Sequence, residues 1–197
     1  PFLAQAGEIV DTAHVAKALA SGAIIWDVRD TAAYASGHIP GAVNIGPITD
    51  VLRDPVKEDW LTNAQLEKVL GQAGIDVADK EVIVYGRASD PTAYFGLLTV
   101  RYLGGRGGKV YEGGIDEWKT AGKTVATEPT KLEPATLKLS TQEHVVVWTD
   151  EMLRKVTEAK AGRVQILDVR SPQEYSGAAV SAIRGGHIPG ARNIPVS

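Results

Sequence analysis

Cysteine is absent from all 197 residues of this chain. Thiol nucleophiles, disulfide bonds and thiolate metal sites are therefore excluded within these residues. Apolar runs approaching the roughly 18 residues of a membrane span are absent as well. The net charge is only −3, so neither nucleic acid nor a membrane surface is an expected partner. The apolar and charged fractions, 44% and 23%, are typical of a soluble globular protein.

Metal-ligand patterns are also missing. Of the four histidines, His14 and His144 are isolated, whereas His38 and His187 each lie in a Gly-His-Ile-Pro-Gly phrase. None of them has the spacing of a zinc site. We therefore expect neither a metal ion nor a cofactor.

One phrase occurs twice in the chain. Residues 24–45 contain Asp-Val-Arg, a later Tyr, Gly-His-Ile-Pro-Gly-Ala and Asn-Ile, and residues 165–194 contain the same pieces in the same order. A repeat of this length indicates two related domains. We expect a complete domain at residues 1–125, a linker at 126–142 that is rich in Pro and Thr, and the N-terminal half of a second domain at 143–197.

The first copy alternates between helical and strand patterns. Capping residues and apolar runs predict helices at 12–20, 62–73, 92–103 and 115–120, and strands at 23–28, 42–45, 81–85 and 109–112. The second copy begins with a predicted helix at 151–159 and a strand at 164–169. Such alternation predicts an α/β domain with a mainly parallel sheet.

The first residues leave the compartment open. Ala4-Gln5-Ala6 is compatible with the end of a cleaved export signal, which would imply the periplasm. An ordinary N-terminal strand or tail, in a cytoplasmic protein, fits the same residues.

Four groups of residues carry a resemblance to a known family. They are Asp-Val-Arg at 27–29 with Gly-His-Ile-Pro-Gly-Ala at 37–42, the strand at 82–85 before a loop and a helix, Gly-Gly-x-x-x-Trp at 113–118, and the second copy at 168–170 and 186–191. In this order they resemble the rhodanese family of sulfurtransferases, in its tandem thiosulfate and 3-mercaptopyruvate forms. The resemblance implies an α/β fold with a parallel sheet flanked by helices, in tandem, with the second copy truncated. It also implies an inactive N-terminal and a catalytic C-terminal domain.

The resemblance places the family's nucleophilic cysteine directly after the strand at 81–85. Loop N–H groups and a helix N-terminus create positive potential there, which lowers the pKa of a thiol. The thiolate takes a sulfane sulfur from a donor as a persulfide and passes it to cyanide or a thiol. This chain has Gly86 at that position. We therefore expect the first domain to be inactive.

The rest of this loop offers no evident substitute. Arg87 is a candidate for holding an anion with the loop N–H groups, but Asp90 opposes this, and a solvated arginine is the preferred interpretation. The Ser89 hydroxyl has no base nearby in the sequence and is interpreted as a polar loop residue or cap. The anion-loop candidates are Gly86, Arg87, Ala88, Ser89 and Asp90.

Several polar residues repeat in both copies irrespective of activity. The histidines are interpreted as structural hydrogen-bonding groups, and the Asp–Arg pairs as ion pairs that fix a strand end. An arginine that borders the active-site pocket is the functional alternative. These residues are Asp27, Arg29, His38, Asp168, Arg170 and His187.

The second copy carries an insert at 176–184, as the catalytic domains of tandem sulfurtransferases commonly do. Several family members have an arginine directly before the aromatic residue at 175, where it helps to hold the anionic donor. This chain has Glu174 there, which leaves the donor open. Arg184 or Arg192 are candidates to supply the missing charge. The candidates for the border of this pocket are Arg170, Glu174, Arg184 and Arg192.

Two functions fit these observations. The first is a sulfurtransferase acting on a small sulfur-donor anion and a thiol or cyanide acceptor, with its cysteine beyond Ser197, so that this chain alone is inactive. The second is a non-catalytic rhodanese-fold module for binding or regulation. A phosphatase-like relative of the same fold has less support, because its chemistry also needs a cysteine.

Half of an α/β domain exposes sheet edges and apolar surface. We therefore expect residues 143–197 to be unstable alone. A missing C-terminal segment or a second chain is the expected partner that completes them. A monomeric chain with a cooperatively folded second domain would contradict this expectation.

Overall fold

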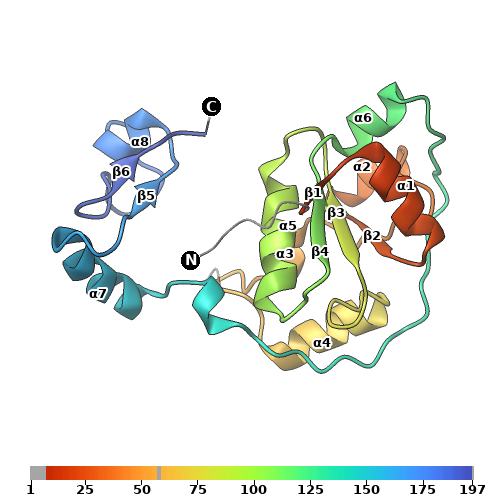
Figure 1. Ribbon diagram of the computed structural model, residues 1–197, viewed down its shortest axis with the longest axis horizontal. Helices are drawn as coiled ribbons and strands as arrows, with labels where there is room; N and C mark the ends of the chain where they lie inside the picture. The colour runs from red at the N-terminus through yellow and green to blue at the C-terminus, as the bar shows by residue number, and fades with distance from the viewer. Residues whose placement is uncertain (1–7, 57–58, 197) are drawn as a thin grey trace. The chain divides into compact units, whose positions relative to one another are not determined.

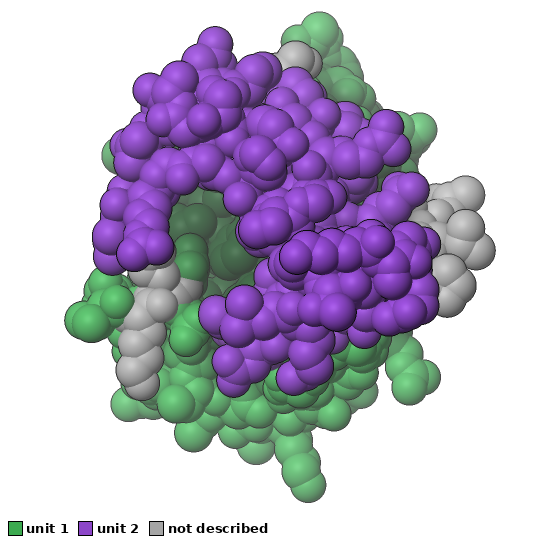
Figure 2. Space-filling model, turned by 90° about the vertical axis from the view of Figure 1, so that its left-hand side faces the viewer, with its two compact units in different colours: residues 1–145 green, residues 146–197 purple. Residues whose placement is uncertain are grey.

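The computed structural model describes residues 8–56 and 59–196. The chain divides into two compact units, Pro1–Val145 (unit 1) and Val146–Ser197 (unit 2), which Figure 2 colours separately. The segment with Ala4-Gln5-Ala6 lies outside the described residues. None of the described helices is both long and apolar enough to cross a membrane.

Unit 1 is built on a parallel sheet of four strands (Figure 1). The strands are β1 (Ile9–Val10), β2 (Ile24–Asp27), β3 (Val82–Tyr85) and β4 (Gly108–Tyr111), in the order β1-β4-β3-β2. The register pairs Asp27 with Tyr85 and Tyr85 with Tyr111. Because β3 and, apart from the terminal Asp27, β2 are apolar and both strands are buried along their whole length, both need cover on two faces. The predicted α/β fold with a parallel sheet is confirmed.

Helices supply this cover. They are α1 (Thr12–Ala20), α2 (Thr31–Ala35), α3 (Ile48–Val51), α4 (Asn63–Gln72), α5 (Pro91–Tyr102) and α6 (Gly114–Thr120). Asp11 caps α1 by accepting the N–H of His14 at 2.8 Å, and Asp90 caps α5, whose first residue is Pro91. The bounds of α1, α4, α5 and α6 lie within one or two residues of those predicted from the sequence.

The two faces of the sheet are packed by different helices. Ile83 and Tyr85 point into a core with Val15 of α1 and Trp118 of α6. The neighbouring residue Val84 points to the opposite face, because side chains alternate along a strand. There α5 approaches so closely that a Cβ at Gly96 would lie 2.5 Å from Val84. Figure 1 shows α5 on one side of the sheet and α1 and α6 on the other.

Two short segments differ from the predictions. Residues 42–45, predicted as a strand, form only an isolated bridge between Val43 and Trp26. The four-residue helix α3 was not predicted, because Pro47 at its start and its small size leave no helical periodicity to detect.

The segment predicted as a linker is bound along unit 1. Ala126 exchanges two backbone hydrogen bonds with His38, each 2.9 Å long. Farther along, the Ala135 N–H donates to the carbonyl of Gly71 at 2.9 Å. The 3-10 helix Glu143–Val145 also belongs to unit 1. Residues 126–145 therefore form a strap on the first domain rather than a free connection.

Unit 2 contains fewer elements. They are α7 (Thr149–Lys160), β5 (Leu167–Asp168), α8 (Pro172–Ser176) and β6 (Arg192–Asn193). The strand predicted at 164–169 is reduced to the two residues of β5, which pair in parallel with β6 alone. In unit 1 the equivalent strand β2 also pairs with β3, and this second neighbour extends it.

Tyr34 ties the strap to the motif of unit 1. Its buried hydroxyl donates to the Ala42 carbonyl at 2.8 Å and accepts the N–H of Thr130 at 3.0 Å. Tyr34→Phe leaves both groups unpaired, so we expect a loss of about 1–3 kcal/mol in the free energy of unfolding. Urea unfolding followed by circular dichroism measures it. Tyr94→Phe is the control. Tyr94 is 37% exposed and its hydroxyl bonds to the exposed side chain of Glu112, where water can replace it, so we expect a change within about 0.5 kcal/mol. Equal losses in the two variants would contradict the assignment.

Candidate functional site

The end of β2 carries a buried ion pair. The Arg29 Nε donates to Asp27 Oδ1 at 2.9 Å, and its Nη2 donates to Oδ2 at 2.6 Å. The same Nη2 also donates to the carbonyl of Gly37 at 2.9 Å, which fixes the Gly-His-Ile-Pro-Gly loop against the strand. Burial disfavours the charge of Arg29, but the hydrogen bonds and charge of Asp27 outweigh it and raise the arginine pKa.

The histidine of this loop is held in place by its own neighbours. His38 is fully buried, and its ring stacks on that of Tyr34 with centroids 3.7 Å apart. Nδ1 lies 3.0 Å from the Tyr34 carbonyl, so Nδ1 is the nitrogen assigned the hydrogen. Among the described residues Nε2 has no hydrogen-bond partner. The geometry is that of a positioning group without access to a substrate.

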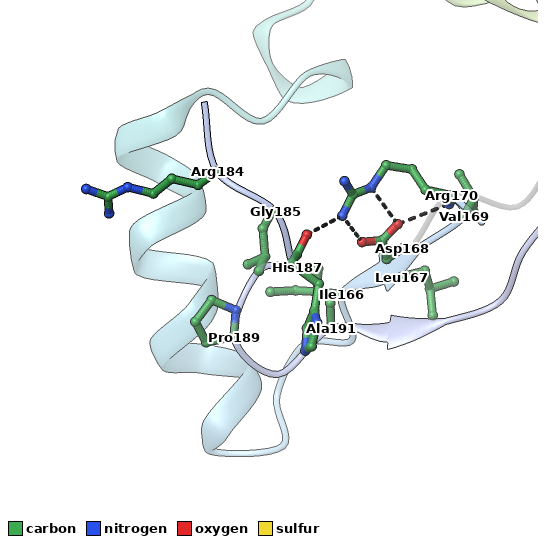
Figure 3. A pocket seen from close by; sticks show the side chains of 12 residues that line it. Ile166, Leu167, Asp168, Val169, Arg170, Arg184, Gly185, His187, Pro189 and Ala191 are labelled. Atoms are coloured by element: carbon green, nitrogen blue, oxygen red, sulfur yellow. Dashed lines mark hydrogen bonds and ion pairs between the residues drawn. The ribbon is translucent and has the colours of Figure 1, made fainter. Parts of the chain in front are cut away.

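Unit 2 repeats the same arrangement almost bond for bond (Figure 3). Arg170 Nη2 donates to Asp168 Oδ2 at 2.6 Å and to the carbonyl of Gly186 at 2.8 Å. The His187 Nδ1 lies 2.8 Å from the Tyr175 carbonyl, with the two rings 3.7 Å apart. We call each set, Asp27-Arg29-Gly37-His38-Tyr34 and Asp168-Arg170-Gly186-His187-Tyr175, a motif node.

The two motif nodes differ in exposure. The side chain of Arg29 is 7% exposed and that of Arg170 is 42% exposed. In unit 1, Tyr85 covers the node: its hydroxyl accepts the N–H of Ile39 at 3.1 Å, and its ring centre lies 5.9 Å from the Arg29 guanidinium carbon. Burial and the nearby Asp27 raise the Tyr85 pKa far above its ordinary value, so its hydroxyl stays neutral.

The corresponding space in unit 2 is a cavity of about 670 Å³. Its lining residues include both ends of the motif node and part of the insert: Asp168, Arg170, Arg184, Gly186, His187 and Ile188. The hydrogen bond from Arg170 lowers the pKa of Asp168, so the carboxylate stays charged although it lies beside an apolar wall. The cavity is therefore lined both by apolar side chains, such as Leu167 and Val169, and by the Asp168–Arg170 ion pair.

Gly86 follows β3 at the carboxyl edge of the sheet, where ligands of parallel α/β folds bind. An ideal Cβ on Gly86 would lie 2.5 Å from Asp90 Oδ2, so the space for a side chain is occupied by that carboxylate. The Ala88 N–H, a candidate for binding an anion, donates instead to Asp116 Oδ2 at 3.0 Å. Ser89, with φ at 56°, donates its N–H to the Glu112 carbonyl at 2.9 Å.

Carboxylates also surround the approach to this loop. A cleft of about 420 Å³ beside Ala88 and Ser89 is lined by Asp11, Glu112 and Glu117. Arg87 is exposed to solvent. The negative charge favours a solvated Arg87 over an anion-binding one, and it opposes the approach of an anionic donor.

Sequence reasoning missed the role of Glu174. Its Oε2 accepts the N–H of Ser171 at 3.2 Å and the Ser171 hydroxyl at 2.8 Å, as in a capping box at the start of α8. These hydrogen bonds lower the pKa of Glu174. The Ser-x-x-Glu spacing was the available signal. Glu174, which replaces the arginine of other members, therefore caps α8 and does not line the cavity.

The arginine candidates of unit 2 are not gathered at one point. Arg170 is engaged by Asp168, and Arg184 lines the cavity with a side chain that extends away from that pair in Figure 3. Arg192 lies on β6 and is exposed, outside the cavity lining. Within the described ranges no group of histidine, aspartate or glutamate residues could hold a metal ion.

The fold and the paired nodes define a class of protein. A family model described as "Rhodanese-like domain" matches residues 11–121 and 149–197. The chain therefore belongs to the rhodanese-like domain family, and the tandem arrangement of the motif corresponds to the two matched segments.

The chain is also similar to individual proteins of this family. The "Sulfur carrier protein TtuD" of Thermus thermophilus is 32% identical over 176 residues, covering 85% of this chain and 61% of the relative. A protein of Mycobacterium tuberculosis named "Putative thiosulfate sulfurtransferase" is 32% identical over 178 residues, covering 86% and 62%. The chain thus spans about three fifths of the length of these relatives.

Solved structures show the same fold. The 3-mercaptopyruvate sulfotransferase SseA of Escherichia coli matches with a TM-score of 0.83 and 23% identity, covering 95% of this chain and 74% of that one. The anaerobic ergothioneine biosynthesis enzyme of Chlorobium limicola matches with a TM-score of 0.82 and 24% identity, covering 99% and 52%.

The two Asp–Arg pairs make matched test sites. Arg29→Met leaves the Asp27 carboxylate buried without its partner, so we expect unit 1 to lose about 3–5 kcal/mol of unfolding free energy. Arg170→Met removes the same bonds from an exposed pair, and we expect almost no shift of the unfolding midpoint. Urea titrations of both variants provide the comparison. Equal shifts of the unfolding midpoint in the two variants would show that burial does not determine how much the ion pair stabilises the chain.

The loop of unit 1 can be tested with an introduced thiol. In Gly86→Cys the thiol must share its space with Asp90, so we expect its pKa above the usual value of about 8.5. Adding Asp90→Asn removes the charge while keeping a residue that caps α5 well. The pKa, measured from the pH dependence of thiol alkylation, should fall by about one unit or more. An unchanged profile in the double variant would refute the role of Asp90.

Proposed function

We propose that the whole protein is a rhodanese-type sulfurtransferase whose nucleophilic cysteine lies outside residues 1–197. The carrying observation is the contrast between the two nodes: the one in unit 1 is closed over by Tyr85, while the one in unit 2 borders a cavity of about 670 Å³. Relatives named as sulfurtransferases and a sulfur carrier support the proposal.

In the proposed reaction, a cysteine thiolate attacks the outer sulfur of a donor such as thiosulfate. The sulfur–sulfur bond of the donor breaks, sulfite leaves with the bonding electron pair, and a cysteine persulfide remains. Cyanide or a thiolate acceptor then attacks the outer persulfide sulfur and releases the cysteine thiolate. Atoms and electrons balance without any further oxidant or reductant.

Unit 1 is then a structural domain rather than a second catalyst. Gly86 provides no nucleophile, and the Asp90 carboxylate fills the space that a thiolate there would need. Asp116 accepts the N–H of Ala88, so this N–H is not available to a thiolate. The acidic cleft beside the loop also repels thiosulfate. In unit 2, by contrast, Arg184 contributes positive charge to the cavity wall.

A non-catalytic binding or regulatory module is the second candidate. It is favoured by the same closed loop of unit 1 and by the absence of cysteine from these residues. The two candidates differ in whether the whole gene product turns over a sulfur donor.

Formation of thiocyanate from thiosulfate and cyanide distinguishes the two functions. We expect turnover by the product of the complete gene and none by residues 1–197, because the chain has no thiol. Repeating the assay with 3-mercaptopyruvate in place of thiosulfate shows which sulfur donor the complete gene product uses. Absence of turnover by the complete product with both donors would exclude the enzyme in favour of the module.

A further inference from the structure

A cavity of about 330 Å³ lies in unit 1 at the C-terminal end of α5. Helix α5 leads from the end of β3 back to the start of β4, so this cavity lies at the amino edge of the sheet, opposite the Gly86 loop. The end of the strap forms its other wall, where the 3-10 helix Glu143–Val145 contacts α5. The polar side chains of the lining belong to Arg101, Arg106, Ser140, Gln142 and His144.

The backbone around this cavity is fixed by its own hydrogen bonds. The last carbonyls of a helix carry partial negative charge, which repels an anion when they are unpaired. Here the Tyr102 carbonyl accepts the N–H of Gln142 from the strap at 2.7 Å. Gly104 has a φ of 93°, and a Cβ added to it would lie 2.7 Å from the Ser140 carbonyl oxygen. The turn after α5 and the strap are therefore in direct contact, which holds the two walls together.

Positive charge predominates in the lining. Two arginines line the cavity and, among the described residues, no carboxylate does. Arg101 forms an ion pair with Glu8 through Nη2, and its planar guanidinium has further N–H donors. Arg106 is exposed and forms no ion pair within the described ranges. The cleft beside the Gly86 loop, which is lined by three carboxylates, has the opposite charge.

Neutral polar groups complete the lining. The Gln142 Nε2 donates to the Ser140 carbonyl at 2.8 Å, which holds the amide against the strap and leaves its second N–H for another acceptor. Forked guanidinium donors match the oxygens of phosphate or sulfate better than they match a spherical ion. The volume is roughly ten times that of one water molecule in the liquid, so such an anion fits together with water or a short organic group.

We propose that this cavity binds a dianionic tetrahedral oxyanion, either free or as the terminal group of a small molecule. Arg106 and Arg101 donate to its oxygens from the α5 side. Gln142 and His144 contact it from the strap.

A long polyanion is a poorer occupant. The whole chain has a net charge of −3, and only two arginines line the cavity. The site lies entirely in unit 1, away from the cavity of unit 2. The inference therefore stands independently of sulfur transfer, and its failure would leave the proposed function untouched.

Inorganic phosphate is the first probe. It is titrated into the 197-residue chain at constant ionic strength, with chloride as the balancing anion, and the backbone amides are followed by NMR. We expect saturable shifts at Gly104, Arg106 and His144, with a Kd of about 1 mM or lower. The amides of Gly86 and Ala88, at the other edge of the sheet, should not shift.

Two arginine variants change the net charge equally. Arg106→Ala removes charge-assisted hydrogen bonds, so we expect phosphate to bind about tenfold more weakly. Arg87→Ala is the matched control and should bind phosphate as the parent chain does, because Arg87 lies beside the Gly86 loop. Both arginines are exposed, so neither substitution should unfold the chain. Arg106→Lys keeps the charge without the planar fork and should restore only part of the affinity.

Titrations with sulfate and glycerol phosphate distinguish the sources of the oxyanion. Tighter binding of glycerol phosphate than of inorganic phosphate would assign the cavity to a phosphorylated small molecule. Tighter binding of inorganic phosphate or sulfate would assign it to the free ion. Either result supports the proposed site.

Three results would overturn the proposal. The first is the absence of saturable shifts at Gly104, Arg106 and His144 in the phosphate titration. The second is equal weakening by Arg106→Ala and Arg87→Ala, since it would indicate a general effect of net charge. The third is an equal response when chloride replaces phosphate at the same ionic strength, since it would indicate screening rather than a bound oxyanion.

Discussion

The structure depends on a fork of hydrogen bonds from one arginine to an aspartate two residues earlier and to a loop carbonyl. In unit 1 the Arg29 side chain joins the end of β2 to Gly37, and in unit 2 Arg170 joins β5 to Gly186. Because the fork uses residues close in sequence, it forms with nearly equal lengths whether or not it is buried. The motif node is thus a local unit, which the sheet covers in unit 1 but leaves partly exposed in the described part of unit 2.

Whether a residue such as Tyr85 covers the motif node determines the role of its ion pair. Under Tyr85 the charges of unit 1 are desolvated and must remain paired, which makes them important for stability and inaccessible to a ligand. Without such cover, the Arg170 pair is solvated and borders a cavity. The same kinds of residue are therefore a core contact in one unit and part of a cavity lining in the other.

Much of the fold could be predicted from local patterns. The apolar runs at 81–85 and 92–103 predicted β3 and α5 within one or two residues, because buried segments leave a local signal in the sequence. The strap was not predicted, since its contacts, such as Ala135 with Gly71, are between backbones far apart in sequence. Gly86 identified the missing nucleophile, but only the structure shows that Asp90 occupies its space. From the sequence, Glu174 is a change of charge at the expected site, whereas its hydrogen bond with Ser171 makes it part of a helix cap.

The central claim is that sulfur is carried by a part of the protein outside these residues, while unit 1 has only a structural role. Intact-mass and peptide mass spectrometry of the complete gene product after exposure to thiosulfate tests it most directly. The account predicts the addition of a single sulfur atom, located on a cysteine outside residues 1–197 and removed by cyanide. No added sulfur, or sulfur located within residues 1–197, would contradict it.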